Sequence, residues 1–190
     1  DLALQDAVST PAERHGPVRF GGTTVAVGLG APFGRIEAEA LNGIATLAES
    51  LGIAEVRLSP WRVLYVAADD GRAADALIAA AGAYGLIAAA GSSLMSIDAC
   101  PGAPACRSGA IPTREMALRL AALMPMRGVS SVHVSGCSKG CARSKVADLV
   151  LVGTPSGFGV VRNGTAADSP EFRLATSDIE RLPSLLNLGA

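Results

Sequence analysis

The sequence predicts an α+β chain of two consecutive units, and two observations lead to this. In the first half, β-branched apolar segments and Ala- and Leu-rich segments follow one another in the order strand, helix, strand, strand, helix. In the second half, all four cysteines lie in two turns rich in Gly, Pro and Ser, between further strands and helices. We therefore expect a lead-in or linker at 1–19, a first unit at 20–93 and a second unit at 94–190.

The composition is that of a compact protein without a strong bias of charge. Of the 190 residues, 49% are hydrophobic and 17% are charged, and the formal net charge is −1. This balance argues against nucleic acids and membrane surfaces as partners. The longest apolar run, at 79–90, is too short to span a bilayer, and the N-terminal segment lacks the features of a signal peptide. We expect a soluble, cytoplasmic protein and, because the first residue is Asp1 rather than Met, a piece of a longer one.

The first unit is expected to form a split βαβ arrangement of the ferredoxin-like type, β-α-β-β-α. Its first helix, at 36–51, carries apolar residues at helical spacing and is followed by Gly52, which suits a helix end. The second helix, at 71–84, is built from strong helix formers such as Ala and Leu. The expected strands are 23–29, 55–58, 62–67, 86–90 and 94–97.

The second unit surrounds the two cysteine-containing turns with regular structure. A helix beginning at Pro112 and a last helix at 177–186 both carry favourable start signals. A hairpin is expected around the sequence T-P-S-G, and a tight turn at Asn163 and Gly164. The expected elements are a helix at 112–124, a strand at 131–135, hairpin strands at 147–152 and 158–162, and the helix at 177–186.

The cysteines form one pair with five intervening residues and one pair with three; they are Cys100, Cys106, Cys137 and Cys141. Four thiols in an unsecreted protein more often bind metal or act in redox chemistry than form disulfides. Structural zinc sites usually use spacings of two to four residues, which only the second pair has. An iron-sulfur cubane tolerates wider gaps because it is larger than one ion, and nearby glycines let backbone N–H groups approach the sulfurs. The spacing favours a 4Fe-4S cluster and leaves zinc open.

The motifs C-x5-C and C-x3-C, with ACPG at the first and GC-x-x-GC at the second, resemble the iron-sulfur half of the sirohaem-dependent nitrite and sulfite reductases. In those proteins too a ferredoxin-like half-module precedes the cluster module. Within this superfamily the chain most resembles the precorrin-3B synthase family, over about residues 20–170. The segments that carry this resemblance are PFGRIEAEAL, RLSPWRVLYV, IDACPGAPAC, HVSGCSKGCA and FGVVRNGTA.

The resemblance implies a nitrite/sulfite reductase-type iron-sulfur α+β domain after the half-module, and an oxidoreductase of cobalamin biosynthesis. Such an enzyme hydroxylates precorrin-3A with dioxygen and forms a lactone on it, with a 4Fe-4S cluster relaying electrons from a reduced donor. The resemblance makes the four cysteines the cluster ligands, and Cys141 matches the ligand that in the reductases also bridges to sirohaem. It further implies a mononuclear iron, for which the two histidines, His15 and His133, offer no evident ligand triad.

A tetrapyrrole with up to about eight carboxylates calls for cations, and Arg pairs with carboxylates in a bidentate manner. The candidates for substrate binding are Arg35, Arg57, Arg62, Arg107, Lys139 and Arg143. Each also has a plainer interpretation, namely a solvated face for Arg57 and electrostatic tuning of the cluster for Lys139 and Arg143. Trp61 suits either core packing or a platform for a macrocycle, and we expect His133 to be a hydrogen-bonded structural residue. No residue is assigned a catalytic role.

Two alternatives of a different kind stay open. The chain suits a module of a sirohaem-dependent sulfite or nitrite reductase, and it also suits a non-catalytic iron-sulfur electron carrier. Because enzymes of the superfamily build the active site between two half-units, we expect a missing N-terminal half or a second protomer to complete it.

Overall fold

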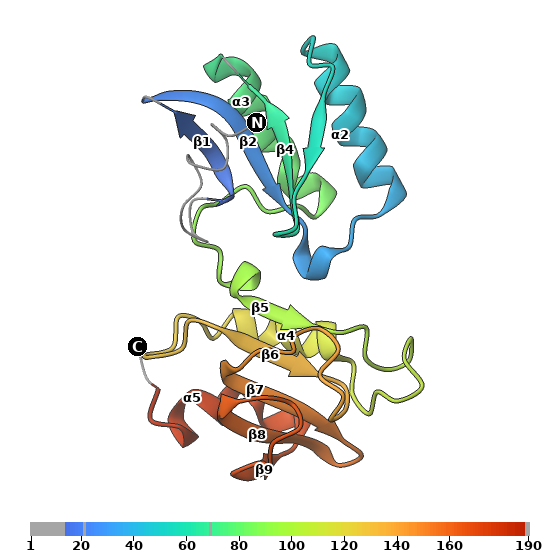
Figure 1. The fold of residues 1–190 in the computed structure, drawn as a ribbon, viewed down its shortest axis with the longest axis vertical. Helices are drawn as coiled ribbons and strands as arrows, with labels where there is room; N and C mark the ends of the chain where they lie inside the picture. Colours follow the sequence, from blue (N-terminus) through green and yellow to red (C-terminus); the bar gives the residue numbers. More distant parts are fainter. Residues whose placement is uncertain (1–13, 21, 69, 189–190) are drawn as a thin grey trace. The chain divides into compact units, whose positions relative to one another are not determined.

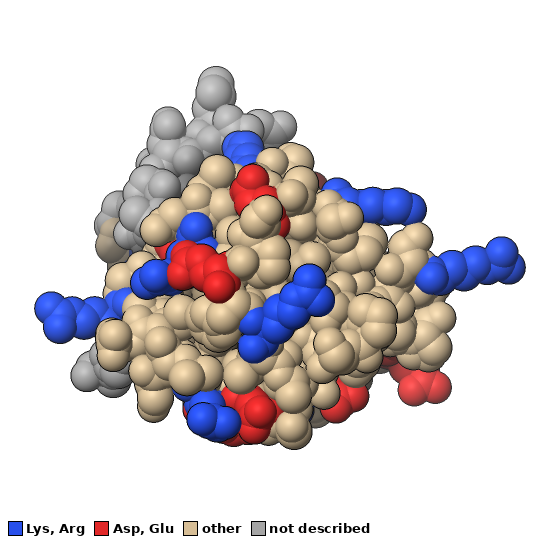
Figure 2. Space-filling model, turned by 90° about the horizontal axis from the view of Figure 1, so that it is seen from below, with Lys and Arg blue, Asp and Glu red and all other residues tan. Residues whose placement is uncertain are grey.

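The computed structural model describes residues 14–20, 22–68 and 70–188. The chain divides into two compact units, a first that ends at Met95 and a second that begins at Ser96 (Figure 1). None of the helices in the described part has the length and apolar character that crossing a bilayer requires. On the face of the molecule in Figure 2, basic and acidic side chains are interspersed rather than gathered into a patch of one sign.

The first unit is a four-stranded antiparallel sheet with two helices, in the strand order β1-β2-β4-β3. Along the chain the core of the unit runs β2, α2, β3, β4, α3, which is the predicted β-α-β-β-α order. Asp70 caps α3 by accepting a hydrogen bond from the Ala73 amide. The elements are β1 (Gly16–Phe20), β2 (Thr23–Gly30), α2 (Ala38–Ser50), β3 (Val56–Leu58), β4 (Val63–Ala67) and α3 (Gly71–Ala81), with short 3-10 helices at Pro32–Gly34 and Gly82–Tyr84.

The two faces of this sheet differ in what covers them. Strand alternation sends Leu29 and Leu64 to the face on which α2 and α3 pack, where Ile44 and Leu77 complete a fully buried core. The opposite face carries a smaller cluster formed by Val18, Ala26, Val63 and Tyr65, with Trp61 and Met95 packed against it. We call this second face the open face of the sheet, because α2 and α3 both pack on the other one.

The structure differs from the sequence prediction at both ends of this unit. Residues expected to be a lead-in form β1, which pairs with β2 and shifts register between Val18 and Arg19. This short edge strand contains Pro17, so its sequence shows little of the alternation that marks a strand. The strand expected at 86–90 is reduced to a single bridge between Ile87 and Gly30, and a 3-10 helix at Ser93–Ser96 replaces the start of the strand expected at 94–97.

The second unit is a five-stranded mixed sheet in the order β5-β6-β7-β8-β9. β5 and β6 are parallel, as are β6 and β7, while the remaining pairs are antiparallel. Helix α4 follows β5 and precedes β6, so it forms the crossover between two parallel neighbours. The elements are β5 (Ile97–Ala99), α4 (Thr113–Ala121), β6 (Val132–Ser135), β7 (Ala147–Thr154), β8 (Gly157–Gly164), β9 (Phe172–Leu174), a 3-10 helix at Thr176–Arg181 and α5 (Leu182–Leu185).

Most of the expected elements of the second unit are present, with two differences. The predicted tight turn at Asn163 and Gly164 is instead the end of β8, where Gly164 pairs with Ala147 and Asn163 adopts a positive φ of 50°. The expected last helix is mainly a 3-10 turn, and α-helical geometry is confined to Leu182–Leu185. β9 has only three residues, too few for a detectable period.

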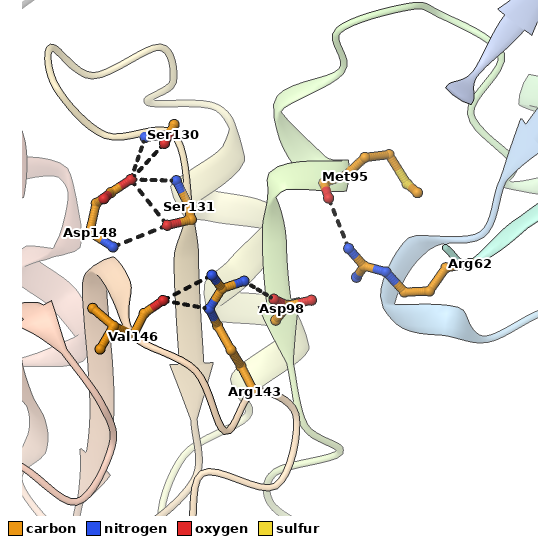
Figure 3. A network of polar contacts seen from close by, with 8 residues as sticks. All are labelled: Arg62, Met95, Asp98, Ser130, Ser131, Arg143, Val146 and Asp148. Carbon is orange, nitrogen blue, oxygen red and sulfur yellow. Dashed lines mark hydrogen bonds and ion pairs between the residues drawn. The ribbon is translucent and has the colours of Figure 1, made fainter. Parts of the chain in front are cut away.

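Asp148 on β7 fastens the start of β6 to its neighbour (Figure 3). Its Oδ2 atom accepts hydrogen bonds from the amide and hydroxyl groups of both Ser130 and Ser131, at 2.8 to 3.0 Å. In return, the Ser131 hydroxyl accepts a hydrogen bond from the Asp148 amide at 3.1 Å. Burial raises the pKa of Asp148, but the four hydrogen bonds outweigh it and hold the pKa below its usual value.

We expect Asp148→Ala to lower the free energy of unfolding by about 1–3 kcal/mol at neutral pH, because two serines lose a charged acceptor. Since the folded-state pKa is depressed, this contribution is complete above the unfolded-state pKa and is lost as pH falls through the folded-state value. Urea unfolding at pH 7 and in acid measures it. The exposed Asp75→Ala on α3 is the control, and a deficit of Asp148→Ala that persists unchanged in acid would contradict the assignment.

Candidate metal centre

The fold brings the two cysteine turns to one edge of the second sheet. Cys100 directly follows β5, and Cys137 follows β6 after a single glycine. These strands are parallel neighbours, with Ile97 opposite Val132 and Ala99 opposite Val134. Because parallel strands end at the same edge, the first cysteine turn (residues 100–110) and the second cysteine turn (residues 136–141) emerge together.

Backbone contacts through Gly136 join the two turns. Its amide donates a hydrogen bond to Sγ of Cys100 at 3.3 Å, and its carbonyl oxygen accepts one from the amide of Ala110 at 2.8 Å. The first cysteine turn is also folded upon itself, because the Cys106 amide donates to the carbonyl of Gly102 at 2.7 Å and the Gly109 amide to that of Cys106 at 3.0 Å. The turns are therefore fixed to each other through the backbone of Gly136.

This approach requires glycine at the contact. A Cβ atom on Gly136 would lie 3.0 Å from Cα of Gly109 and 3.3 Å from Cα of Gly102, closer than real Cβ contacts normally are. Gly102 itself has a φ of 62°, in the left-handed region, and a Cβ there would meet the backbone of Thr113 at 2.7 Å. The glycines predicted to let backbone approach the sulfurs do so at Gly136.

The four thiols are free and lie in different surroundings. Cys100 is buried, Cys106 and Cys137 are half-buried, and Cys141 is exposed. Thr113, which is fully buried, donates a hydrogen bond to the carbonyl of Cys100 and lies 4.0 Å from its sulfur. The disulfide alternative is therefore not realised in this structure.

The four cysteines are the candidate ligands of the metal centre. Across the described ranges, no three Cys, His, Asp or Glu side chains gather closely enough to hold a single metal ion. A zinc site brings its sulfurs to about 2.3 Å from one centre, whereas a cubane places its thiolates around a larger body. The N–H group of Gly136 directed at the Cys100 sulfur is the kind of donor that stabilises a thiolate ligand. Four free thiols in two turns that emerge together are a donor set that a 4Fe-4S cluster can take.

His133 differs from the sequence prediction. It lies on β6 opposite Asp98 and is fully buried, but neither ring nitrogen has a hydrogen-bond partner within the described part of the chain. Its Cε1 atom would be 3.7 Å from a Cβ on Gly140, which places the ring beneath the second cysteine turn. Burial lowers the pKa of His133, Asp98 opposes this and Arg143 adds to it. The imidazole is therefore neutral at pH 7.

Arg143 connects the segments on either side of the cysteines (Figure 3). Its Nη1 atom pairs with Oδ2 of Asp98 at 3.0 Å, just before Cys100 in the chain. Its Nε and Nη2 atoms donate to the carbonyl of Val146 at 3.1 and 2.9 Å, just after the second cysteine turn. All three contacts hold the turns in place, a role that sequence spacing did not reveal.

The remaining predicted cations fall into two groups. In the second unit, Lys139 is exposed and donates to the hydroxyl of Ser108 at 3.0 Å, which adds a second bridge between the turns, and Arg107 is exposed on the first cysteine turn. In the first unit the three arginines lie apart from these turns in the sequence. Arg35 pairs with Glu37 at 2.7 Å, Arg57 pairs with Glu55 at 2.8 Å, and Arg62 donates to the carbonyl of Met95 at 2.8 Å.

Comparisons with known proteins agree with this architecture. Residues 19–84 match the family model of the nitrite/sulfite reductase ferredoxin-like half domain. The chain is 36% identical over 153 residues to a precorrin-3B synthase from Sinorhizobium sp, which is 80% of this chain and 33% of that protein. It is 30% identical over 137 residues to sulfite reductase (ferredoxin) 1 of Mycolicibacterium paratuberculosis, covering 67% of this chain and 25% of the relative. The structure of Mycobacterium tuberculosis NirA superposes with a TM-score of 0.70 and 22% identity, over 92% of this chain and 37% of NirA.

Residues 19–84 thus carry a nitrite/sulfite reductase ferredoxin-like half domain, and the chain is a homologue of proteins of that superfamily. Within that superfamily it is a homologue of precorrin-3B synthase. The fold similarity to NirA extends over both units, which confirms the predicted fold class. The chain spans about a third of the length of the relatives it matches.

We expect Gly136→Ala to reduce iron incorporation on anaerobic reconstitution to less than about half of the wild-type amount, because the added Cβ separates the turns. Iron and sulfide per chain are measured, together with the melting temperature. Gly82→Ala is the matched control, since a Cβ there meets nothing within 4 Å. Equal iron content in Gly136→Ala and wild type would show that the contact between the turns is not needed.

A second substitution tests the link made by Arg143. We expect Arg143→Lys to release iron to a chelator about tenfold faster than wild type, because lysine keeps the charge but cannot hold Asp98 and Val146 together. Arg162→Lys, in an exposed pair with Glu171, is the control. Release at the wild-type rate would return Arg143 to the candidates for substrate binding.

Proposed function

We propose that this chain is part of an enzyme with precorrin-3B synthase activity, which hydroxylates precorrin-3A with dioxygen and forms a lactone on it in cobalamin biosynthesis. The observation that carries the proposal is the 36% identity to a precorrin-3B synthase over 153 residues. An alignment of that length is longer than either unit, so both units take part in the similarity. Two sulfite reductases of Mycolicibacterium paratuberculosis match at lower identity, 27% and 30%.

The reaction sets the requirements that the protein has to meet. Hydroxylation by dioxygen puts one oxygen atom into the product and reduces the other to water, which consumes two electrons and two protons. Closing a lactone then adds a peripheral carboxyl group across a double bond of the macrocycle: a C–O bond forms as the π bond breaks, and the proton passes to the macrocycle, so no further oxidant is needed. The enzyme must therefore deliver electrons, hold a polyanionic macrocycle and orient one of its carboxylates.

Cys100, Cys106, Cys137 and Cys141 would hold the 4Fe-4S cluster, which when bound supplies single electrons from a reduced donor. Around it, the chain's own groups prepare the ligands. The Gly136 amide stabilises the buried Cys100 thiolate, and Arg143 fixes the segments that carry the two pairs. The exposed Cys141 is the ligand nearest to solvent.

The exposed arginines of the first unit suit substrate carboxylates. The ion pairs of Arg35 with Glu37 and of Arg57 with Glu55 are solvent-exposed, and water and salt weaken such pairs. Exchanging the glutamate for a substrate carboxylate therefore has little energetic cost. Arg107 and Lys139 offer the same interaction beside the cysteine turns, whereas we assign Arg143 to positioning.

The rest of the active site would come from a second half-unit, either an N-terminal half of a longer protein or a second protomer. The match to about a third of each relative's length supports this. We assign no ligands to a mononuclear iron; among the described residues no three candidate ligands gather. We place the enzyme in the cytoplasm, where reduced donors keep such thiols free.

A second candidate is a module of a sirohaem-dependent sulfite or nitrite reductase. The sulfite reductase relatives and the fold shared with NirA favour it. In that case Cys141, exposed in this unit, would be the residue shared with sirohaem. A non-catalytic electron carrier would bind the cluster but neither tetrapyrrole.

The experiment is anaerobic purification with metal analysis, absorption and EPR spectra, followed by incubation with precorrin-3A, a reductant and isotopically labelled dioxygen. We expect about four iron atoms per chain, a broad absorption band at about 400 nm, and one labelled oxygen atom in the product. Cys141→Ala should lose the cluster, whereas Ser144→Ala in the same exposed segment should keep it. A bound sirohaem would move the chain to the reductases, and one zinc without iron would overturn both functions.

A further inference from the structure

The open face of the first sheet holds three buried polar groups that have no hydrogen-bond partner within the described ranges. They are Nε of Arg14, Nδ1 of His15 and the hydroxyl of Tyr65. The residues His15 and Tyr65 are only 6% and 4% exposed. Buried polar groups are nearly always paired, so three unpaired groups on one sheet face point to a ligand that pairs with them.

Two glycines of β2 bring the three groups to one place. Gly28 and Gly30 are two residues apart, so both face the open side, and neither has a side chain to fill it. A Cβ on Gly28 would overlap the carbonyl oxygen of Arg14 and lie 3.1 Å from Cε1 of Tyr65. A Cβ on Gly30 would lie 3.0 Å from Cδ2 of His15. The chain at Arg14 and His15 thus crosses the sheet directly over these two positions, beside the Tyr65 ring.

The charged groups that act on this point among the described residues, Arg14 and Arg62, are positive. The Arg14 guanidinium lies over the Trp61 ring, 4.4 Å from its centroid, and Arg62 is held by the carbonyl of Met95. Burial lowers the pKa of His15, and the charges of Arg14 and Arg62 lower it further. Burial raises the pKa of Tyr65 more than Arg14 lowers it. At neutral pH the site therefore offers a protonated phenol, a neutral imidazole and a guanidinium, a set rich in donors and without negative charge of its own.

We propose that Arg14, His15 and Tyr65 form a carboxylate-binding subsite on the open face of the first unit. The identity of its ligand rests on the proposed function: the ligand is a peripheral carboxylate of the tetrapyrrole substrate. A carboxylate has about four acceptor positions, enough for all three donors, and hydrogen bonds to ionised acceptors are the stronger ones. Arg14 is half-buried and a cation–π contact with Trp61 holds its guanidinium, so a modest shift of this side chain opens the way to the other two groups.

The test is a calorimetric titration of the chain with uroporphyrin, a tetrapyrrole that carries carboxylates on its periphery, and separately with citrate. We expect Tyr65→Phe and Arg14→Gln to weaken the binding of both about tenfold or more, as the loss of a hydrogen bond to a charged group does. The melting temperature of unliganded Tyr65→Phe should equal or exceed that of wild type, because the hydroxyl that it removes has no partner in the described part of the chain. If the hydroxyl had a structural role, the melting temperature of Tyr65→Phe would be lower than that of wild type.

Matched controls are available for both changes. Tyr84→Phe removes the hydroxyl of the other tyrosine, which packs on the helix-covered face, and Arg19→Gln removes an exposed positive charge from β1. Both should bind the two probes as wild type does. A loss of affinity in Arg19→Gln as large as that in Arg14→Gln would reduce the effect to net charge and overturn the subsite.

The outcomes separate the subsite from the enzyme. If wild type binds uroporphyrin and Tyr65→Phe binds it equally well, the subsite is wrong and the proposed function stands. A third outcome is that wild type binds citrate but not uroporphyrin, and that Tyr65→Phe weakens the binding of citrate. This result would support the carboxylate subsite and would not support the tetrapyrrole function. Binding of neither probe by wild type overturns the subsite.

Discussion

The parallel pairing of β5 and β6 is the constraint on which the candidate metal centre depends. About thirty residues separate the two cysteine pairs, and only this pairing makes their turns leave the sheet together. The crossover helix α4 enforces it, because Met116, Ala117 and Leu120 bury one side of the helix in the core of the unit. A metal site whose halves meet through strand register is formed by folding of the whole unit rather than by a local loop.

Near that edge of the sheet, a buried imidazole lacks the hydrogen bonds that such a group normally makes in a protein core. His133 lies fully buried beneath the second cysteine turn, and neither ring nitrogen has a partner among the described residues, while Asp98 and Arg143 beside it are paired with each other. An unpaired buried imidazole costs free energy, of the order of 1–3 kcal/mol. Such local conflicts are expected where a site takes precedence over stability.

The sequence predicts those parts of the structure that carry a periodic apolar pattern or a characteristic residue spacing. The long β2, the helices α2 and α3 and the hairpin of β7 and β8 each carry their pattern within one segment. β1 and β9 are short edge strands, so no pattern distinguishes them. The pairing of Arg143 with Asp98, 45 residues away, and the unpaired state of His133 depend on tertiary contacts that no local signal encodes. For the cysteines, spacing indicated a cluster and the resemblance named the superfamily.

The cysteine turns and the proposed carboxylate subsite both depend on glycines that allow close approach. At Gly136, and at Gly28 and Gly30, the absence of a side chain lets backbone or donor groups approach closely, and the donors that result are buried. A chain with a net charge of −1 does not attract polyanions through its overall field. Exposed arginines such as Arg35 and Arg57 are screened by salt, with a Debye length of about 8 Å at physiological ionic strength, whereas buried donors are screened far less. In the proposed cluster site and the proposed carboxylate subsite, selection of the anion would therefore rest on where the backbone lets donors be buried, and a net charge of −1 is compatible with that.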